Sequence, residues 1–451
     1  MTIHSTHRRL GALLLSALVQ CVVGCGDDPE QRAPRDETAR AAADDAGAEA
    51  NADASRTITV QGRLLDMASA PLAGIPVFVG DRPLALTNAS GEFSATNVST
   101  PYTLTALVSA SKTVVIYEGL SRPDPTIIAA DRLALRKAGI QGTLAGGAGY
   151  PEAALTRTSV QLAAAPVQEA MAGLSDLGAN TFIVPPDGTT WSGPKTIQGT
   201  LHALQYTHAA ASDLKPIDYA GYGALANVSI SDGENHVPLP VTLAPIGKVS
   251  FSASATIPPA YAVTAKVLQL TVGGQTILRL PNDTQPGPAV AYPLPAIADA
   301  RVRLTVTAEN ADTGAASSTT RSGLALDAAN VALGILPSPT LVLPVDAATG
   351  VSERTSFSWT KSDQGIHMLF ASAGPGHPQY QIVTSSTEAL LPDLSEAGIQ
   401  LPPATTYHWI VTAYAPFDSV DRYAGDDVGA RNSVPVLYDA RSAVRSFTTS
   451  P

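Results

Sequence analysis

The stretch LPPATTYHWIVTA, residues 401–413, is the clearest guide to the fold of this chain. After the two prolines, Tyr407, Trp409, Val411 and Ala413 occupy every second position. Side chains with a period of two share one face of a β-strand. The pattern therefore predicts a strand that points these four side chains into a core.

The same stretch carries a family pattern. The order Leu-x-Pro-x-Thr-x-Tyr is matched by Leu401, Pro403, Thr405 and Tyr407, and residues 338–451 thereby resemble a fibronectin type III domain. The resemblance implies that Trp359, Leu401 and Tyr407 are structural. It also implies that Tyr407 is a tyrosine corner, with its ring in the core and its hydroxyl bonded to nearby backbone.

An insertion at residues 415–440 departs from that pattern and contains Pro, Asp and Tyr. Long loops often carry binding function. We therefore expect any ligand surface of this module to lie in the insertion, and we expect the insertion to tolerate shortening.

Composition extends the β-rich interpretation to the whole chain. The 451 residues include 36 Gly and 35 Pro, which favours short strands and many turns. The length allows roughly three or four domains. We expect an all-β fold, a tandem array of about four immunoglobulin-like or transthyretin-like β-sandwich modules. Their expected bounds are 56–135, 136–246, 247–337 and 338–451.

The module at 56–135 has alternating strands and recognisable turns. Pro71 to Gly74 reads PLAG, Gly91 to Phe93 reads GEF, and Pro101 to Leu104 reads PYTL. Together they resemble the carboxypeptidase regulatory-like domain, a transthyretin-type β-sandwich. The resemblance implies an accessory module of exported proteins that is not itself a peptidase, with Phe93 and Tyr102 in the core.

The two middle modules are predicted from local patterns. IQGTL occurs at 140–144 and again at 197–201, and VQGRL at 60–64 is a near copy, which suggests a glycine that permits a bulge or close packing. The helical spacing of Val167, Met171, Leu174 and Leu177 predicts one short surface helix. Residues 267–280, centred on Gly273-Gly274, predict a hairpin.

The N-terminus predicts export. Residues 10–25 read LGALLLSALVQCVVGC after two arginines, and Val22 to Cys25 resembles the lipobox of bacterial lipoproteins. Residues 1–24 would then be a signal peptide and Cys25 the lipidated residue of an outer-membrane protein, since Gly26 replaces the Asp that favours inner-membrane retention. The alternatives are an uncleaved signal anchor or an ordinary secretory peptide cut nearby.

The linker at 25–55 has nine acidic residues and three arginines. Few large apolar side chains are present to offset the entropy of ordering, so we expect a flexible, disordered tether. An Ala-rich helix is the alternative.

Most chemical functions lack a supporting motif in the sequence. A net charge of −11 without a basic stripe argues against nucleic acid as a partner. No Gly-x-Ser-x-Gly, His-Glu-x-x-His or phosphate-loop pattern is present. We therefore expect no catalytic residues, no metal and no cofactor.

Two function classes remain open. The first is a non-catalytic, lipid-anchored cell-envelope protein whose modules act as an adhesion or protein-binding scaffold. The second is a carbohydrate-binding envelope lipoprotein, with a sugar platform made by Trp191, Tyr206, Tyr219 and Tyr222. The expected partners are the membrane, through the lipid anchor, and an unknown envelope protein or polysaccharide.

Overall fold

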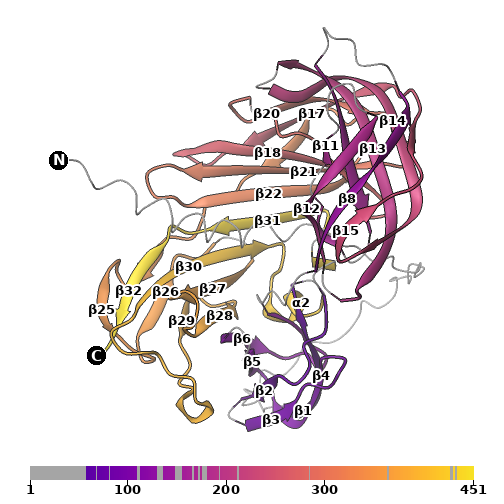
Figure 1. The fold of residues 1–451 in the computed structure, drawn as a ribbon. Coiled ribbons are helices and arrows are strands. Elements are labelled where there is room, and N and C mark those ends of the chain that lie inside the picture. The colour runs from indigo at the N-terminus through magenta and orange to yellow at the C-terminus, as the bar shows by residue number, and fades with distance from the viewer. Residues whose placement is uncertain are drawn as a thin grey trace, which may run out of the picture.

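A computed structural model describes residues 57–451, except 68, 81, 109–111, 130–135, 148–154, 165–166, 171–172, 175–179, 192, 211–212, 284, 363–364, 427–429 and 432–433. The predicted signal peptide, Cys25 and the acidic linker lie outside the described residues. The regular secondary structure of the described chain is almost entirely β-strand, as Figure 1 shows, so the all-β prediction is confirmed. None of its helices is long and apolar enough to cross a membrane.

One sheet of fourteen strands, here called the central sheet, runs through three of the modules. Its order is β19 (Gln275–Arg279), β18 (Tyr261–Val272), β21 (Arg301–Asn310), β22 (Ala316–Leu324), β31 (Val436–Arg441), β30 (Thr406–Ala415), β27 (Ile366–Ser372), β28 (Gln379–Thr384), β6 (Thr113–Leu120), β5 (Tyr102–Val108), β2 (Pro76–Val79) and β3 (Arg82–Leu86). β32 (Arg445–Thr449) pairs with β30 and with β25 (Ala348–Val351).

Three small sheets complete the sandwiches. The first module adds β4 (Glu92–Ser99), β1 (Thr57–Asp66) and β7 (Thr126–Ala129); the third adds β20 (Ala289–Pro295), β17 (Lys248–Thr256) and β23 (Val331–Gly334); the last adds β24 (Leu341–Leu343), β26 (Ser356–Trp359) and β29 (Glu388–Leu390). Each pairing of a small sheet with part of the central sheet encloses its own apolar core. Burial of these faces is the main stabilising contribution.

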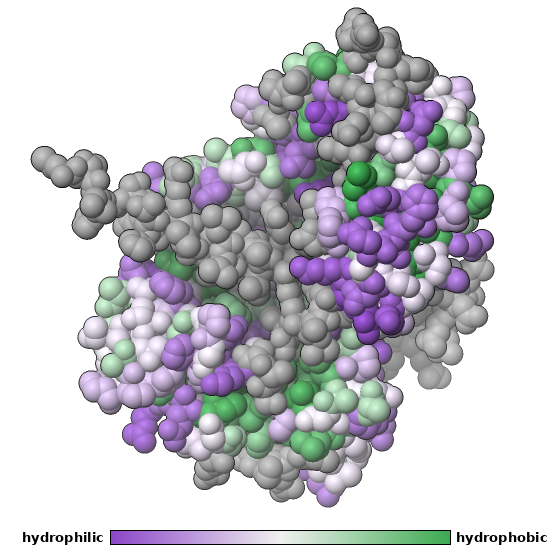
Figure 2. Space-filling view, in the orientation of Figure 1, coloured by the Kyte–Doolittle hydropathy of each residue, from purple (hydrophilic) through white to green (hydrophobic). Residues whose placement is uncertain are grey.

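Residues 136–246 differ from the sandwich expected there. They form one nine-stranded sheet, β14 (Asp213–Ser231), β13 (Thr196–Ala210), β9 (Thr156–Ala163), β11 (Gly173–Leu174), β12 (Thr181–Trp191), β8 (Arg136–Gly146) and β15 (Gly233–His236), with β10 (Val167–Ala170) beside β12 and β16 (Val241–Leu243) beside β8. Tyr222 and Ala244 exchange two backbone hydrogen bonds of 2.9 Å, which join the two ends of the sheet. We call this the rolled sheet, and hydrophilic residues gather over β8 and β15 on its visible face (Figure 2).

The predicted helix at 167–177 is wrong where the structure describes it. Val167 and Glu169 belong to β10 and pair with Trp191 and Thr190 of β12, while Leu174 belongs to β11 and pairs with Ile183. Met171 and Leu177 lie outside the described residues. Sheet pairing overrides a weak helical spacing that contains no capping signal.

The predicted hairpin is confirmed. β18 pairs with β19 through Val272 and Gln275, and Gly273 and Gly274 take φ values of 56° and 81°. Two successive residues with positive φ are the requirement of a tight hairpin turn, which glycine meets without strain.

The strand predicted from LPPATTYHWIVTA is β30, and its alternate residues Tyr407, Trp409, Val411 and Ala413 are all buried. The Tyr407 ring stacks on Phe447, with centroids 5.3 Å apart. The expected hydrogen bond of a tyrosine corner is absent, because the Tyr407 hydroxyl is buried without a partner among the described residues. Burial raises the pKa of Tyr407 to about 12.

Candidate binding groove between the first and last modules

The first and last modules are joined by strand pairing. β6 of the first module pairs in parallel with β28 of the last, from Thr113 beside Gln379 to Tyr117 beside Val383. Because side chains alternate along a strand, β6 contributes side chains to two hydrophobic cores, one on each of its faces. Val115 and Tyr117 pack in the core of the first module, whereas Val114 and Ile116 pack in that of the last.

The 415–440 insertion strengthens this junction and is not the exposed ligand loop that we expected. It contains the short helix α2 (Val420–Tyr423), and Phe417, Val420 and Tyr423 are buried in the core of the first module. The insertion therefore has a structural role, because its apolar side chains cover a face of a neighbouring module.

Polar contacts fix the insertion in place. The Asp421 carboxylate accepts hydrogen bonds from the backbone N–H groups of Ser121 (2.8 Å) and Arg122 (3.1 Å). Arg122 in turn donates to the backbone oxygen of Asp421 at 2.7 Å. Hydrogen bonds with a charged partner are stronger than neutral ones.

A buried arginine completes these contacts. The Arg431 guanidinium lies 3.8 Å from the centroid of the Tyr423 ring and donates to the backbone oxygen of Thr126 at 3.0 Å. The Thr126 N–H donates to the backbone oxygen of Ala424 at 2.7 Å. The start of β7 is thus held between two parts of the insertion.

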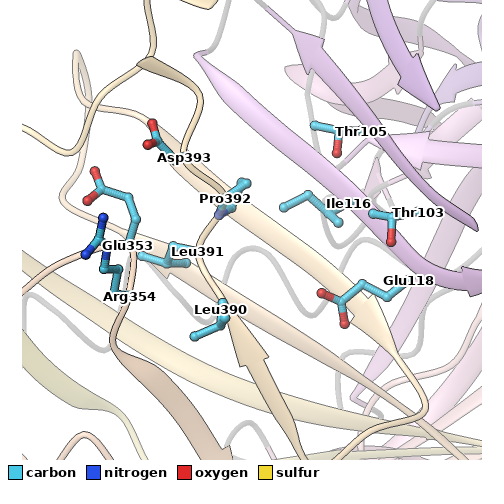
Figure 3. Close-up of a pocket in the computed structure, with 10 residues that line it drawn as sticks. All are labelled: Thr103, Thr105, Ile116, Glu118, Glu353, Arg354, Leu390, Leu391, Pro392 and Asp393. Carbon is cyan, nitrogen blue, oxygen red and sulfur yellow. The ribbon is translucent and has the colours of Figure 1, made fainter. Parts of the chain in front are cut away.

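A groove of about 390 Å³ opens beside this junction (Figure 3). Its lining comes from both modules: Thr103, Thr105, Ile116 and Glu118 from β5 and β6, and Glu353, Arg354, Leu390, Leu391, Pro392 and Asp393 from the last module. Figure 3 shows Glu118 on one wall and Glu353 and Asp393 on the other, with Leu391 and Pro392 between them. A volume of this size is within the range of ligand pockets, roughly 300–1,000 Å³.

The groove carries more negative than positive charge, with three carboxylates and one guanidinium in its lining. Burial raises the pKa of Glu118, and a hydrogen bond with Thr384 partly opposes that effect. Hydrogen bonds from the Ser395 side chain and backbone hold the pKa of Asp393 below its usual value. At neutral pH the groove therefore favours a cationic ligand.

The four aromatic residues proposed as a sugar platform do not form one. Trp191 is buried in the rolled sheet, with its indole N–H donated to the backbone oxygen of Pro194 at 2.8 Å. Tyr206 and Tyr219 are buried against the third module, and the Tyr219 hydroxyl donates to Pro293. Tyr222 is partly buried and shares a 2.8 Å hydrogen bond with His202.

The three residues predicted to be structural lie in or against the core of the last module. Trp359 and Tyr407 are buried in this core, and the partly buried Leu401 packs against the same cluster. Among the residues that the structure describes, no group of three or more His, Cys, Asp or Glu side chains could hold a metal ion.

The groove residues were not predicted from the sequence. Glu118 follows the apolar residues Val114 to Tyr117 within β6, and Leu390 to Asp393 lies in a turn-rich stretch about 270 residues away. Neither stretch contains a motif, and only the pairing of β6 with β28 brings them together.

Comparison with known proteins gives no family for the chain. No family model and no curated protein matches it. The chain is similar at 9% identity to BcpA, the major pilin subunit of Bacillus cereus, with a TM-score of 0.13, covering 62% of this chain and 99% of that one. It is similar at 12% identity to a tetra-tandem repeat in the extending region of a large adhesion protein, with a TM-score of 0.14 and coverage of 87% and 98%. At these TM-scores the likenesses carry no argument about function.

Proposed function

We propose that this chain is an exported lipoprotein, anchored at the outer membrane through Cys25, whose β-sandwich modules act as a non-catalytic scaffold for adhesion or protein binding. The anchor rests on the lipobox-like Val22 to Cys25. The binding role rests mainly on one observation, the groove that the first and last modules form together.

The junction supports a binding role because it keeps both walls of the groove in place. Strand pairing, two shared cores and the insertion all resist movement of β6 relative to β28. A preformed site loses less entropy when its partner binds. We propose a protein partner because the groove is lined by aliphatic side chains, three carboxylates, one arginine and two threonines, with none of the aromatic faces on which sugars stack.

The anchor is tested by the variant Cys25→Ser. Each methylene of a buried acyl chain contributes about 0.8 kcal/mol to membrane binding. We expect the wild-type chain in the outer-membrane fraction and the variant in the soluble fraction of the cell envelope. Retention of the variant in the membrane fraction would disprove lipid anchoring at Cys25.

The binding role is tested by photo-crosslinking in intact cells. A photoreactive amino acid at Leu390, in the groove, should give a discrete crosslinked protein product. The matched control is Leu239, which is 62% exposed but lies in the segment of the rolled sheet. Equal products from both positions, or none from Leu390, would contradict a binding role for the groove.

A further inference from the structure

The groove lies along the unpaired edge of a sheet. In the small sheet of the last module, the order is β24, β26, β29, so β29 has a strand on one side and none among the described strands on the other. Leu390 of β29 lines the groove together with Ile116 and Glu118 of β6. An exposed edge of this kind is a template for adding a further strand.

The backbone hydrogen-bonding groups at that edge point away from β26. The Trp359 N–H donates to the backbone oxygen of Thr387, and Phe357 pairs with Ala389, so the odd-numbered residues here bond to β26. In an antiparallel pair the intervening residues direct their backbone groups outward. Glu388 satisfies its N–H with the Ser386 hydroxyl at 3.1 Å, which leaves the backbone groups of Leu390 for a partner.

The side chains around this edge specify the chemistry of the added strand. A strand beside β29 would lie next to the face of β5 and β6 that turns toward the last module, where the buried Ile116 and the half-buried Glu118 line the groove. Apolar and cationic side chains of such a strand would meet these two residues. Glu353 and Asp393 on the opposite wall favour further positive charge.

We propose that the groove binds an extended basic segment of a partner protein, which adds as a fourth strand to the small sheet at β29. This inference rests on the proposed function and specifies its partner. Main-chain hydrogen bonds to Leu390 give the segment its extended conformation. The carboxylates of Glu118, Glu353 and Asp393 select Lys and Arg.

The test uses a fluorescent peptide of sequence KVKVKV and the full chain. We expect saturable binding by fluorescence anisotropy and no binding of EVEVEV. Because backbone amides of a strand alternate between its two edges, methylating one alternate set of amide nitrogens should abolish binding while methylating the other set should not. Equal binding of both methylated peptides would overturn strand addition.

Variants of the protein test the role of charge. We expect Glu118→Gln to weaken KVKVKV binding about ten-fold, equivalent to about 1.4 kcal/mol. The control Glu309→Gln removes an exposed carboxylate of β21, far along the central sheet, and should leave the affinity unchanged. Equal effects of the two variants would show that binding follows net charge alone and would overturn the assignment to the groove.

The outcomes separate this inference from the proposed function. Crosslinking at Leu390 together with no binding of KVKVKV would overturn the basic segment and retain a binding role for the groove. If neither the crosslink at Leu390 nor binding of KVKVKV is observed, the binding role of the groove is disproved as well.

Discussion

Gly62 lies so close to the ring of Phe93 that any added Cβ would be 2.3 Å from a ring carbon. A Cβ added at Gly142 would likewise lie too close to the Phe182 ring, and one added at Gly199 too close to the backbone oxygen of Ala163. The repeated IQGTL motif and its near copy therefore mark three places where close packing requires glycine, as the sequence predicted.

We expect Gly62→Ala to lower the free energy of unfolding of the first module by about 1 to 3 kcal/mol, because the ring must move in a packed core. The measurement is the denaturation midpoint of the first module, monitored by hydrogen exchange of the backbone amides in β1 and β4. Gly334→Ala is the matched control, since Gly334 lies in a strand with no atom within 4 Å of its added Cβ. A similar loss in both variants would contradict the packing explanation.

Tyr407 is a residue whose position follows from the sequence and whose hydrogen bond does not. Alternation fixes the face of a strand, but the geometry of a hydroxyl depends on neighbouring backbone that no pattern encodes. An unpaired buried hydroxyl costs roughly 1 to 3 kcal/mol in desolvation. Tyr407→Phe removes that group and keeps the ring stacked on Phe447.

We therefore expect Tyr407→Phe to leave the denaturation midpoint of the last module unchanged or to raise it. Trp359→Ala, which empties part of the same core, should cost about 3 to 5 kcal/mol. A clear loss of stability in Tyr407→Phe would show that the hydroxyl has a partner.

At the scale of elements, burial by another module explains two wrong predictions, the exposure of the tyrosines on β13 and β14 and the exposure of the 415–440 insertion. Three of the aromatic residues proposed as a sugar platform lie on β13 and β14, namely Tyr206, Tyr219 and Tyr222, and all three pack against the core of the third module. In the same way, the 415–440 insertion has the turn residues of a surface loop, yet its apolar side chains fill a neighbouring core. The local sequence predicts a strand and which side chains share a face. Which other module covers that face depends on residues distant in the sequence.

The contact between the insertion and the first module gives a prediction. Asp421→Ala removes the acceptor of two backbone N–H groups, at Ser121 and Arg122, and leaves those donors unpaired. We expect faster hydrogen exchange at the end of β6 and a loss of roughly 1 to 3 kcal/mol. Asp418→Ala, on the same segment, removes an exposed carboxylate and is expected to cost less than 1 kcal/mol. Unchanged exchange in Asp421→Ala would show that the apolar contacts alone hold the junction.

At the scale of the whole molecule, the last module in the sequence lies beside the first. The modules follow one another along the sequence, but the first is paired with the last through β6 and β28, and the third is paired with the last through β22 and β31. Strand alternation and turn residues predict the β-rich character of all four modules, although residues 136–246 form a rolled sheet and not the expected sandwich. The central sheet could not be predicted in this way, because strand order across modules depends on contacts between residues more than 100 positions apart in the sequence.

The pairing of first and last modules predicts the behaviour of a cut chain. With a protease site placed within residues 130–135, cleavage should leave the N-terminal fragment, which contains β1 to β7, bound to the rest of the chain, because β6 is buried on both faces and the insertion covers the first module. Size-exclusion chromatography of the cleaved protein should show one peak containing both fragments. Adding Ile116→Asp should separate them, since a carboxylate buried without a partner costs several kcal/mol. Thr103→Asp, at an exposed position on β5, should not. Separation of the unsubstituted fragments would mean that the modules are independent units joined only by the chain.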